Sequence, residues 1–151
     1  MQDERERLSR ILELGQEIAN VKDVDVLLQR ILKEARLFTN ADAGSIYVKD
    51  NNKLKFSYTQ NETIQSKLPP GKKMIYSTFT VPINNKSISG YVANTGSMLN
   101  IPDAYYLSEE APYSFDKQYD IASGYRTKSM MTFPIKTHRG EIIGVLQLIN
   151  S

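Results

Sequence analysis

Two apolar stretches near the C-terminal end dominate the hydrophobic pattern of the chain. Residues 130–135 form the first and residues 142–149 the second, and both are apolar at nearly every position rather than at alternate ones. The polar segment 137–140 between them ends in glycine, which predicts a β-hairpin. Continuously apolar strands are typically covered on both faces. We therefore expect this hairpin at the centre of a sheet, with helices or loops on either side.

Two helical patterns open the chain. Residues 3–20 carry a narrow apolar stripe, and residues 23–38 carry a wider one. The narrow stripe consists of Leu8, Ile11, Leu12 and Ile18. This stripe would pack either against a partner helix or against the chain's own sheet, and the pattern does not decide between the two. The wider face predicts a helix that packs on the sheet, and its members are Leu27, Leu28, Ile31, Leu32, Ala35 and Phe38.

Four shorter strands are expected in the middle of the chain. They cover residues 45–48, 54–59, 79–83 and 98–101. Alternation is clearest in the second, where Leu54, Phe56 and Tyr58 are separated by polar residues. Pro82 restricts the third strand to a sheet edge. Residues 60–78 contain Pro69-Pro70-Gly71 and are expected to be irregular.

The remaining segments supply a cap for the sheet. Residues 88–94 predict a short helix that Gly96 ends. Residues 103–123 form a long polar and aromatic connection, with a short helix expected at 115–119. The whole pattern is that of an α+β fold, in which a mostly antiparallel sheet lies between a helix layer and a cap of loops and short helices.

Composition narrows the function classes. The 151 residues suit one domain, and 19 Lys+Arg against 17 Asp+Glu give a net charge of only +2. So small an excess does not indicate nucleic acid or an anionic membrane as a partner. No run is long enough for a transmembrane helix, and no signal peptide opens the chain. Cysteine is absent, which agrees with a cytoplasmic location and excludes thiolate chemistry.

No catalytic constellation appears in the sequence. The single histidine, His138, falls in the predicted hairpin turn and is expected to be a solvated turn residue rather than a metal ligand. We therefore expect no enzymatic activity, metal or cofactor in this chain. The residues point instead to a small-molecule pocket, because the helix start at Ile88-Ser89-Gly90 offers free amides and Gly90 permits close approach.

Aromatic residues from the connection are expected to close this pocket. They are Tyr105, Tyr106, Tyr113, Phe115 and Tyr119. Aromatic walls with a few polar groups are typical of small-molecule sites. The alternative is that these side chains simply pack over the sheet, and for any single one of them that alternative is favoured.

Several segments resemble the GAF domain, especially the regulatory GAF domains of cyclic-nucleotide phosphodiesterases and bacterial signalling proteins. The resemblance covers roughly residues 24–150 and is carried by SGYVANTG at 89–96, LNIPDAY at 99–105, SGYRTK at 123–128, FPIK at 133–136 and GVLQLIN at 144–150. It implies a profilin-like fold with a six-stranded antiparallel sheet, helices packed behind it and a ligand pocket under the front loops. Residues 23–151 would then be the GAF domain, and residues 1–22 a linker or dimerisation helix.

The resemblance also implies a set of ligand-binding positions, to which the aromatic segment adds Phe115. They are Ser45, Thr59, Gln60, Ile88, Ser89, Phe115, Asp116, Ser123, Thr127 and Gln147. In cyclic-nucleotide-binding relatives the cyclic phosphate meets the helix start that matches Ile88 and Ser89. A Phe-Asp pair grips the base where Thr59-Gln60 stands here. The loss of that aromatic platform and carboxylate weighs against guanine recognition.

Two functional hypotheses follow. The first is a regulatory ligand-sensing domain whose lid closes over a small molecule, and the second is a ligand-free dimerisation and signal-relay module. GAF-fold methionine sulfoxide reductases use cysteines, so their chemistry is excluded. The last strand ends at residue 150 without the closing helix that usually leads to an output domain. We therefore expect a cytoplasmic, homodimeric part of a larger signalling protein, with an output such as a phosphohydrolase or a diguanylate cyclase.

Overall fold

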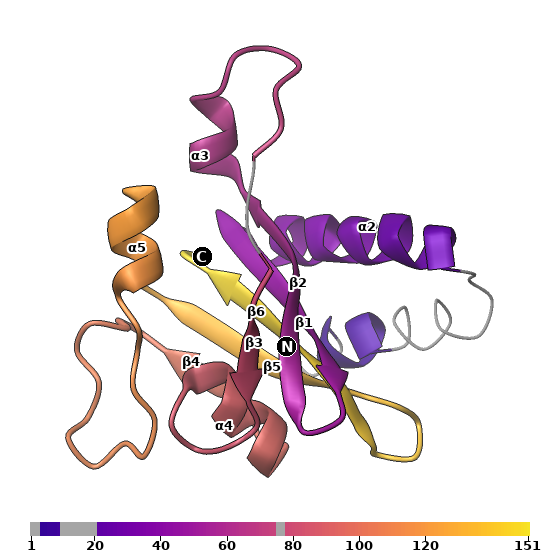
Figure 1. Cartoon of the computed structure of the whole chain (residues 1–151), viewed down its shortest axis with the longest axis vertical. Helices are drawn as coiled ribbons and strands as arrows, with labels where there is room; N and C mark the ends of the chain where they lie inside the picture. Colours follow the sequence, from indigo (N-terminus) through magenta and orange to yellow (C-terminus); the bar gives the residue numbers. More distant parts are fainter. Residues whose placement is uncertain (1–3, 10–20, 75–77) are drawn as a thin grey trace.

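A six-stranded antiparallel sheet separates one long helix from a layer of short helices and loops (Figure 1). The computed structural model describes residues 4–9, 21–74 and 78–151. The spatial order of the strands is β3-β2-β1-β6-β5-β4. Their bounds are β1 (Ala43–Asp50), β2 (Lys53–Asn61), β3 (Thr80–Pro82), β4 (Leu99–Ile101), β5 (Met130–Lys136) and β6 (Ile142–Ile149). The structure confirms the expected α+β class with a helix behind the sheet and a cap in front.

The C-terminal hairpin forms as predicted. Strands β5 and β6 pair with Phe133 opposite Leu146, and the other edge of β6 pairs with β1. Gly140 takes a left-handed φ of 84° in the connecting loop, where Thr137 N donates to Glu141 O at 2.8 Å. β6 is thus a central strand with cover on both faces, which explains its nearly unbroken run of apolar residues.

Helix α2 (Val21–Thr39) packs on the rear face of the sheet, the face that we define by this contact. Its buried side chains Ile31 and Leu32 join one core cluster with Leu146 of β6. The expectation for Phe38 is wrong, since its side chain is 47% exposed. The inward stripe continues four residues from Leu32 to Arg36, which is 7% exposed, and this turns Phe38 outward.

The first helical pattern is described only at residues 4–9, which are helical. Leu8 packs against the rear core cluster, so for this residue the structure favours packing on the chain's own sheet. The Arg7 guanidinium lies 5.8 Å from the centre of the Phe38 ring. Ile11, Leu12 and Ile18, the rest of the proposed dimer stripe, lie outside the described residues. None of the helices that the structure describes is both long and apolar enough to cross a membrane.

A bulge in β2 changes which side chains face the front. Ile46 of β1 pairs with Tyr58 while Tyr47 pairs with Phe56, so Ser57 is an extra residue without a partner position in the ladder. Phe56 consequently packs with Tyr47 on the front face, whereas Tyr58 packs on the rear core cluster. The predicted alternation of Leu54, Phe56 and Tyr58 on one face is therefore wrong from Ser57 onward.

The front layer consists of short helices and loops. Helix α4 (Ile88–Thr95) confirms the predicted 88–94 helix and ends at Gly96, whose φ is 73°. Helix α5 (Gln118–Ser123) begins later than the expected 115–119. Helix α3 (Glu62–Ser66) was not predicted, because five residues show no periodicity. Asn61 caps it by accepting the Ile64 amide at 2.9 Å. Figure 1 shows α3 and its following loop projecting from one end of the sheet.

Candidate functional site

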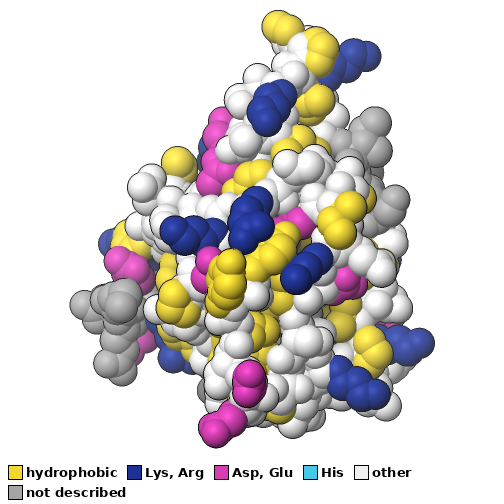
Figure 2. Space-filling view, turned by 90° about the vertical axis from the view of Figure 1, so that its left-hand side faces the viewer, with side chains coloured by type: hydrophobic (Ala, Val, Ile, Leu, Met, Phe, Trp, Pro, Cys, Tyr) yellow, Lys and Arg dark blue, Asp and Glu magenta, His cyan; other side chains and the backbone are white. Residues whose placement is uncertain are grey.

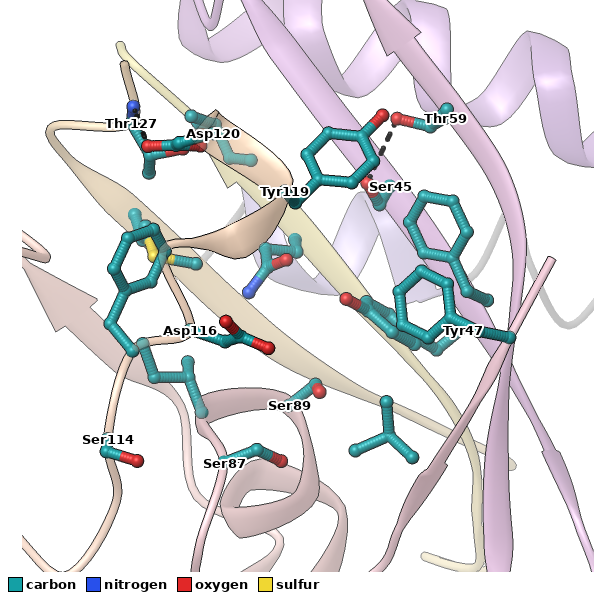
Figure 3. A pocket seen from close by; sticks show the side chains of 18 of the residues that line it. Ser45, Tyr47, Thr59, Ser87, Ser89, Ser114, Asp116, Tyr119, Asp120 and Thr127 are labelled. Carbon is teal, nitrogen blue, oxygen red and sulfur yellow. Dashed lines mark hydrogen bonds between the residues drawn. The ribbon is translucent and has the colours of Figure 1, made fainter. Parts of the chain in front are cut away.

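A cavity of about 470 Å³ lies between the front face of the sheet, the start of α4 and the 103–123 segment, which we call the lid. Side chains from β1, β2, β6, α4 and the lid line it. Figure 3 shows the hydroxyl groups of Ser87 and Ser89 at the start of α4, with the Asp116 carboxylate on the same side of the view. The expected pocket under the lid is therefore present.

The start of α4 forms one end of the cavity. Ser87 Oγ accepts the Gly90 amide at 3.0 Å, and Ser87 O accepts the Tyr91 amide at 2.9 Å. The Ser89 amide donates to no atom of the described residues. The side chain of Ser89 is 5% exposed, and its residue lines the cavity. This helix start can donate to an anionic group, as the sequence suggested.

Gly90 has a different role from the one expected. A Cβ at this position would lie 2.6 Å from Pro82 O and 2.8 Å from Asn84 O. The close approach that glycine permits is therefore made by the loop after β3, and not by a ligand. Gly90 fixes the helix start against this loop and so positions Ser89 indirectly.

Buried polar groups form the floor of the cavity. Tyr47 is 8% exposed, and burial raises the pKa of its hydroxyl to about 12 against the weaker opposing effect of a hydrogen bond with Ser89. Tyr47 is thus a neutral phenol at physiological pH. Ser45 Oγ and Thr59 Oγ1 are 3.2 Å apart, and Gln147 Nε2 donates to Thr132 Oγ1 at 3.3 Å.

A buried carboxylate fastens the lid. Asp120 is 6% exposed and accepts the Thr127 amide at 2.7 Å, the Thr127 hydroxyl at 2.8 Å and the Tyr105 hydroxyl at 2.7 Å. The hydrogen bond to Asp120 raises the pKa of Tyr105. The Arg126 guanidinium covers the Tyr105 ring at 4.0 Å from its centre. These contacts hold the two ends of the lid together while α5 lies over the cavity.

Tyr125 connects the cavity wall to the end of the last strand. Its hydroxyl donates to Asp42 Oδ2 at 2.7 Å and accepts from Asn150 Nδ2 at 2.8 Å. Burial, followed by the hydrogen bond to Asp42, raises the pKa of Tyr125 well above its usual range. Asn150 also accepts the amides of Lys128 and Ser129, so the segment after the lid is fixed to the end of β6.

An aromatic cluster forms the wall of the cavity near β3. Phe56 and Phe79 are stacked, with ring centres 4.6 Å apart and planes 14° apart. Tyr47 meets Phe56 edge-on at 5.3 Å, and Tyr119 of α5 lies 6.3 Å from Phe56. Phe56 and Phe79 were not predicted as site residues. Only the pairing of β2 with the β3 segment brings them together, and no local pattern indicates that contact.

Most of the predicted site residues meet at the cavity. Those that line it are Ser45, Thr59, Ile88, Ser89, Phe115, Asp116, Thr127 and Gln147. Gln60 lies on the rear side instead, where its Nε2 donates to Gln29 O at 2.8 Å, because the bulge at Ser57 turns Thr59 forward and Gln60 back. Ser123 is exposed in the last turn of α5 and is not part of the lining. These placements correct the expectations for Gln60 and Ser123.

The aromatic residues of the lid divide between lining and support. Phe115 and Tyr119 line the cavity. Tyr105 packs on Phe115 at 5.3 Å, and Tyr113 packs on Tyr91 at 5.0 Å. Tyr106 is 77% exposed. Figure 2, which looks at the left-hand side of the Figure 1 view, shows hydrophobic side chains at the surface among lysines and arginines. His138 is exposed in the hairpin loop, and the described part of the chain holds no cluster of metal-ligating side chains.

Comparison with known proteins places these features in a family. The sequence model of the GAF domain matches residues 23–151. A cGMP-specific 3',5'-cyclic phosphodiesterase of Drosophila virilis is 33% identical over 146 residues, which cover 92% of this chain and 15% of that protein. The corresponding protein of Drosophila melanogaster is 31% identical over 146 residues and is covered to 12%. The chain therefore spans only a small part of these curated relatives.

Solved structures show the same fold at low identity. The nlh2 GAF domain of A. aeolicus in an inactive state superposes with a TM-score of 0.64 at 17% identity, covering 99% of this chain and 78% of that one. A methyl-accepting chemotaxis protein gives 0.58 at 20% identity, covering 95% and 77%. The free methionine-R-sulfoxide reductase of Neisseria meningitidis gives 0.57 at 17% identity, covering 97% and 72%. These likenesses establish the architecture alone.

Proposed function

Because this chain belongs to the GAF domain family, we propose that it is the small-molecule-sensing regulatory domain of a larger signalling protein. The observation that carries the proposal is the cavity of about 470 Å³ beneath the lid. Its volume lies in the range typical of ligand sites, about 300–1,000 Å³. A cavity of this size in an otherwise well-packed domain leaves apolar wall unfilled, which a ligand would cover.

The polar groups of the cavity favour a ligand that carries a negative charge. The start of α4 presents the Ser89 amide and the hydroxyls of Ser87 and Ser89, and Lys86 also lines the cavity. A helix N-terminus favours anions by about 0.3–1 kcal/mol or more when partly buried. Asp116 also lines the cavity, and its carboxylate would accept a hydrogen bond from a donor group of the ligand. A small phosphate ester such as a cyclic nucleotide meets both requirements.

The relatives support this class without fixing the ligand. Their names assign the cleavage of cGMP to whole proteins of which this chain matches 12–15%. Thr59 lines the cavity here, and Gln60 faces away from it, so the Phe-Asp pair that the resemblance implied for gripping a base is absent at these positions. We propose that the base, rather than the phosphate, determines which nucleotide this domain prefers.

Regulation would follow from the position of the lid. A ligand that contacts Tyr125 or Asp116 would stabilise the closed lid, and Tyr125 is bonded to Asn150 at the end of β6. A change in the population of the closed-lid state would thereby affect the end of β6, which we propose leads to an output domain. We propose a phosphohydrolase or a diguanylate cyclase as such an output, acting from a cytoplasmic homodimer.

Binding to the isolated domain tests this function. Thermal unfolding and calorimetry would be measured with cGMP, cAMP, 5'-GMP and a panel of other anionic metabolites. A probe at about 100 times its Kd should stabilise the fold by about 2.7 kcal/mol. Ser89→Phe, which fills the cavity, should abolish that gain. The matched variant Ser97→Phe, at an exposed site beyond the same helix, should retain it. If the whole panel leaves the unfolding temperature unchanged, sensing by this cavity is ruled out.

A ligand-free dimerisation module remains the second candidate. Val26 and Leu37 of α2 are 68% and 70% exposed, which favours a contact on the outer side of this helix. Sedimentation over a range of protein concentrations decides it. A monomer at every concentration, in a chain that extends past residue 151, would count against this candidate.

A further inference from the structure

Helix α3 projects from the end of the sheet but starts at the cavity wall (Figure 1). Asn61, the last residue of β2, lines the cavity and is 8% exposed. The same side chain caps α3, since its Oδ1 accepts the Ile64 amide at 2.9 Å. The first amides of a helix have no partners within the helix, so this cap fixes the start of α3. One residue is therefore both part of the cavity wall and the cap of the helix.

A second contact joins α3 to the segment that follows the lid. Asp42 Oδ2 accepts the Thr63 hydroxyl at 2.6 Å and the Tyr125 hydroxyl at 2.7 Å. Thr63 belongs to the first turn of α3, and Tyr125 lines the cavity just after α5. Hydrogen bonds to a carboxylate are about twice as strong as those between neutral groups. One oxygen atom thus holds α3 and the cavity wall at the same time.

The backbone of Asp42 is fixed independently of its side chain. Its carbonyl accepts the Glu62 amide at 2.9 Å and Arg36 Nη1 at 3.0 Å, and its amide donates to Asn150 O at 3.1 Å. Two of these bonds tie Asp42 to the ends of α2 and β6. Because the backbone is held in this way, a shift of Tyr125 is passed by the carboxylate to Thr63 rather than absorbed by the chain around Asp42.

Helix α3 has little other packing to hold it. None of its residues is buried. Gln65 in this helix fixes the loop that follows, because its Nε2 donates to Lys72 O at 2.7 Å and its Oε1 accepts the Met74 amide at 3.2 Å. The helix and the loop therefore form one unit. Elements with few buried contacts open more readily than the core, so the order of this unit depends on Asn61 and Asp42.

We propose that residues 62–74, which we call the α3 arm, are a second output of the cavity and are coupled to it through Asp42. The inference rests on the proposed sensing function and deepens its regulation, because it adds a route besides the end of β6. A ligand that holds Tyr125 in place keeps the Asp42 carboxylate oriented toward Thr63 and orders the arm. Withdrawal of Tyr125 leaves that carboxylate free to rotate, and the arm loosens. Asp42 is the contact whose two arrangements both elements bias.

Hydrogen exchange measured by mass spectrometry tests the coupling without a ligand. Thr63→Val and Tyr125→Phe each remove one hydroxyl from Asp42, and each should speed exchange of its own element about 10-fold or more. Thr63→Val should also speed exchange of residues 125–129, and Tyr125→Phe that of residues 64–68, by about 3-fold or more. Coupling is reciprocal, so unchanged or slower exchange at the distant element in either variant would overturn it.

Two matched variants and one rescue make this test specific. Ser66→Ala removes a hydroxyl that donates to Thr63 O inside α3, so it should affect the arm alone. Tyr106→Phe alters a lid tyrosine that is 77% exposed, and it should affect neither element. Thr63→Ser keeps the hydroxyl and should restore slow exchange of residues 125–129. If this segment exchanges as fast in Thr63→Ser as in Thr63→Val, the hydroxyl is not the cause and coupling through Asp42 is overturned.

Exchange in the presence of a probe connects the arm to the cavity. cGMP and cAMP would be added in excess to wild type and to Thr63→Val. In wild type a bound probe should slow exchange of residues 125–129 and of the arm, each by about 3-fold or more. In Thr63→Val the same probe should still slow residues 125–129 and should leave the arm unchanged.

The outcomes separate this inference from the proposed function. If a probe slows residues 125–129 of wild type but not the arm, sensing stands and the arm as an output is overturned. If a probe slows the arm equally in wild type and in Thr63→Val, the route through Asp42 is overturned. If no probe slows exchange anywhere, sensing of these nucleotides and the arm as its output both fall, while the variants alone still decide whether Asp42 couples the two elements.

Discussion

The two faces of the sheet have been filled in different ways. Behind it, Leu32 of α2 packs on Ile46 of β1 and Leu146 of β6, and each of these side chains is 2% exposed or less. In front, neighbouring positions on the same strands carry Ser45 and Gln147, and they border a cavity. One strand therefore contributes alternately to a close-packed core and to a partly empty site.

The difference separates two contributions: the rear face supplies most of the packed core, and the front face supplies the candidate site. Packed apolar side chains on the rear face exclude water and specify the position of α2. The front face holds polar groups in place with hydrogen bonds, such as those of Asp120, and leaves room between them. If this division is right, rear substitutions should lower global stability, and front substitutions should act mainly on the lid and on binding.

The largest effect is expected at Leu32, which is fully buried on the rear face. Leu32→Ala removes packing that the sheet cannot replace, so the free energy of unfolding should fall by about 2–5 kcal/mol. Urea denaturation followed by far-UV circular dichroism measures it. Leu37→Ala, on the same helix at 70% exposure, is the matched control and should change stability by less than about 0.5 kcal/mol. Similar losses for the two variants would contradict the rear core as the source of stability.

A smaller and more local effect is expected at Asp120. Asp120→Ala leaves the Thr127 amide and the hydroxyls of Thr127 and Tyr105 without their acceptor, at a cost of about 2–3 kcal/mol. The lid should open before the domain unfolds, because these bonds hold the lid and not the sheet. Limited proteolysis within residues 103–123 should accelerate at temperatures where the sheet remains folded. Asp120→Asn keeps one acceptor and should show an intermediate rate. Loss of lid and sheet in one transition would contradict the division.

The sequence was sufficient for the parts of the fold that local patterns determine. The apolar runs of β5 and β6 predicted a central hairpin, and Ser87 with Gly96 marks the limits of α4 as a capping residue and a helix stop. Pro82 placed β3 at the edge of the sheet. Each of these signals lies within a few residues of its consequence, so no knowledge of distant contacts was needed.

The parts that failed depend on contacts between distant residues. The bulge at Ser57 is visible only in the pairing with β1, and it reverses the orientation of Gln60 and Tyr58. The exposure of Phe38 follows from Arg36 turning inward. Likewise, the stacked pair of Phe56 and Phe79 joins segments 23 residues apart in number across a projecting loop. A single sequence gives no warning of such pairings, and this is why the cavity was expected while one of its walls was missed.

The smallest expected effect concerns Tyr47 on the front face, where its ring is buried in the front core and its hydroxyl borders the cavity. Burial raises its pKa in the folded state to about 12 from 10.0, so the folded protein holds this proton more tightly than the unfolded chain. The stability from this difference is complete below pH 10 and is lost as the pH rises through 12. At pH 11 wild type should have lost about 1.4 kcal/mol of its free energy of unfolding through this group.

Tyr47→Phe should lack that part of the loss, while its stability at pH 7 changes by about 1 kcal/mol or less. Urea denaturation of both proteins at pH 7, 9, 10 and 11 gives the two curves, with pH 7 as the internal reference. Parallel curves would mean that water reaches this hydroxyl freely, and the front face would then be an open groove instead of a closed site.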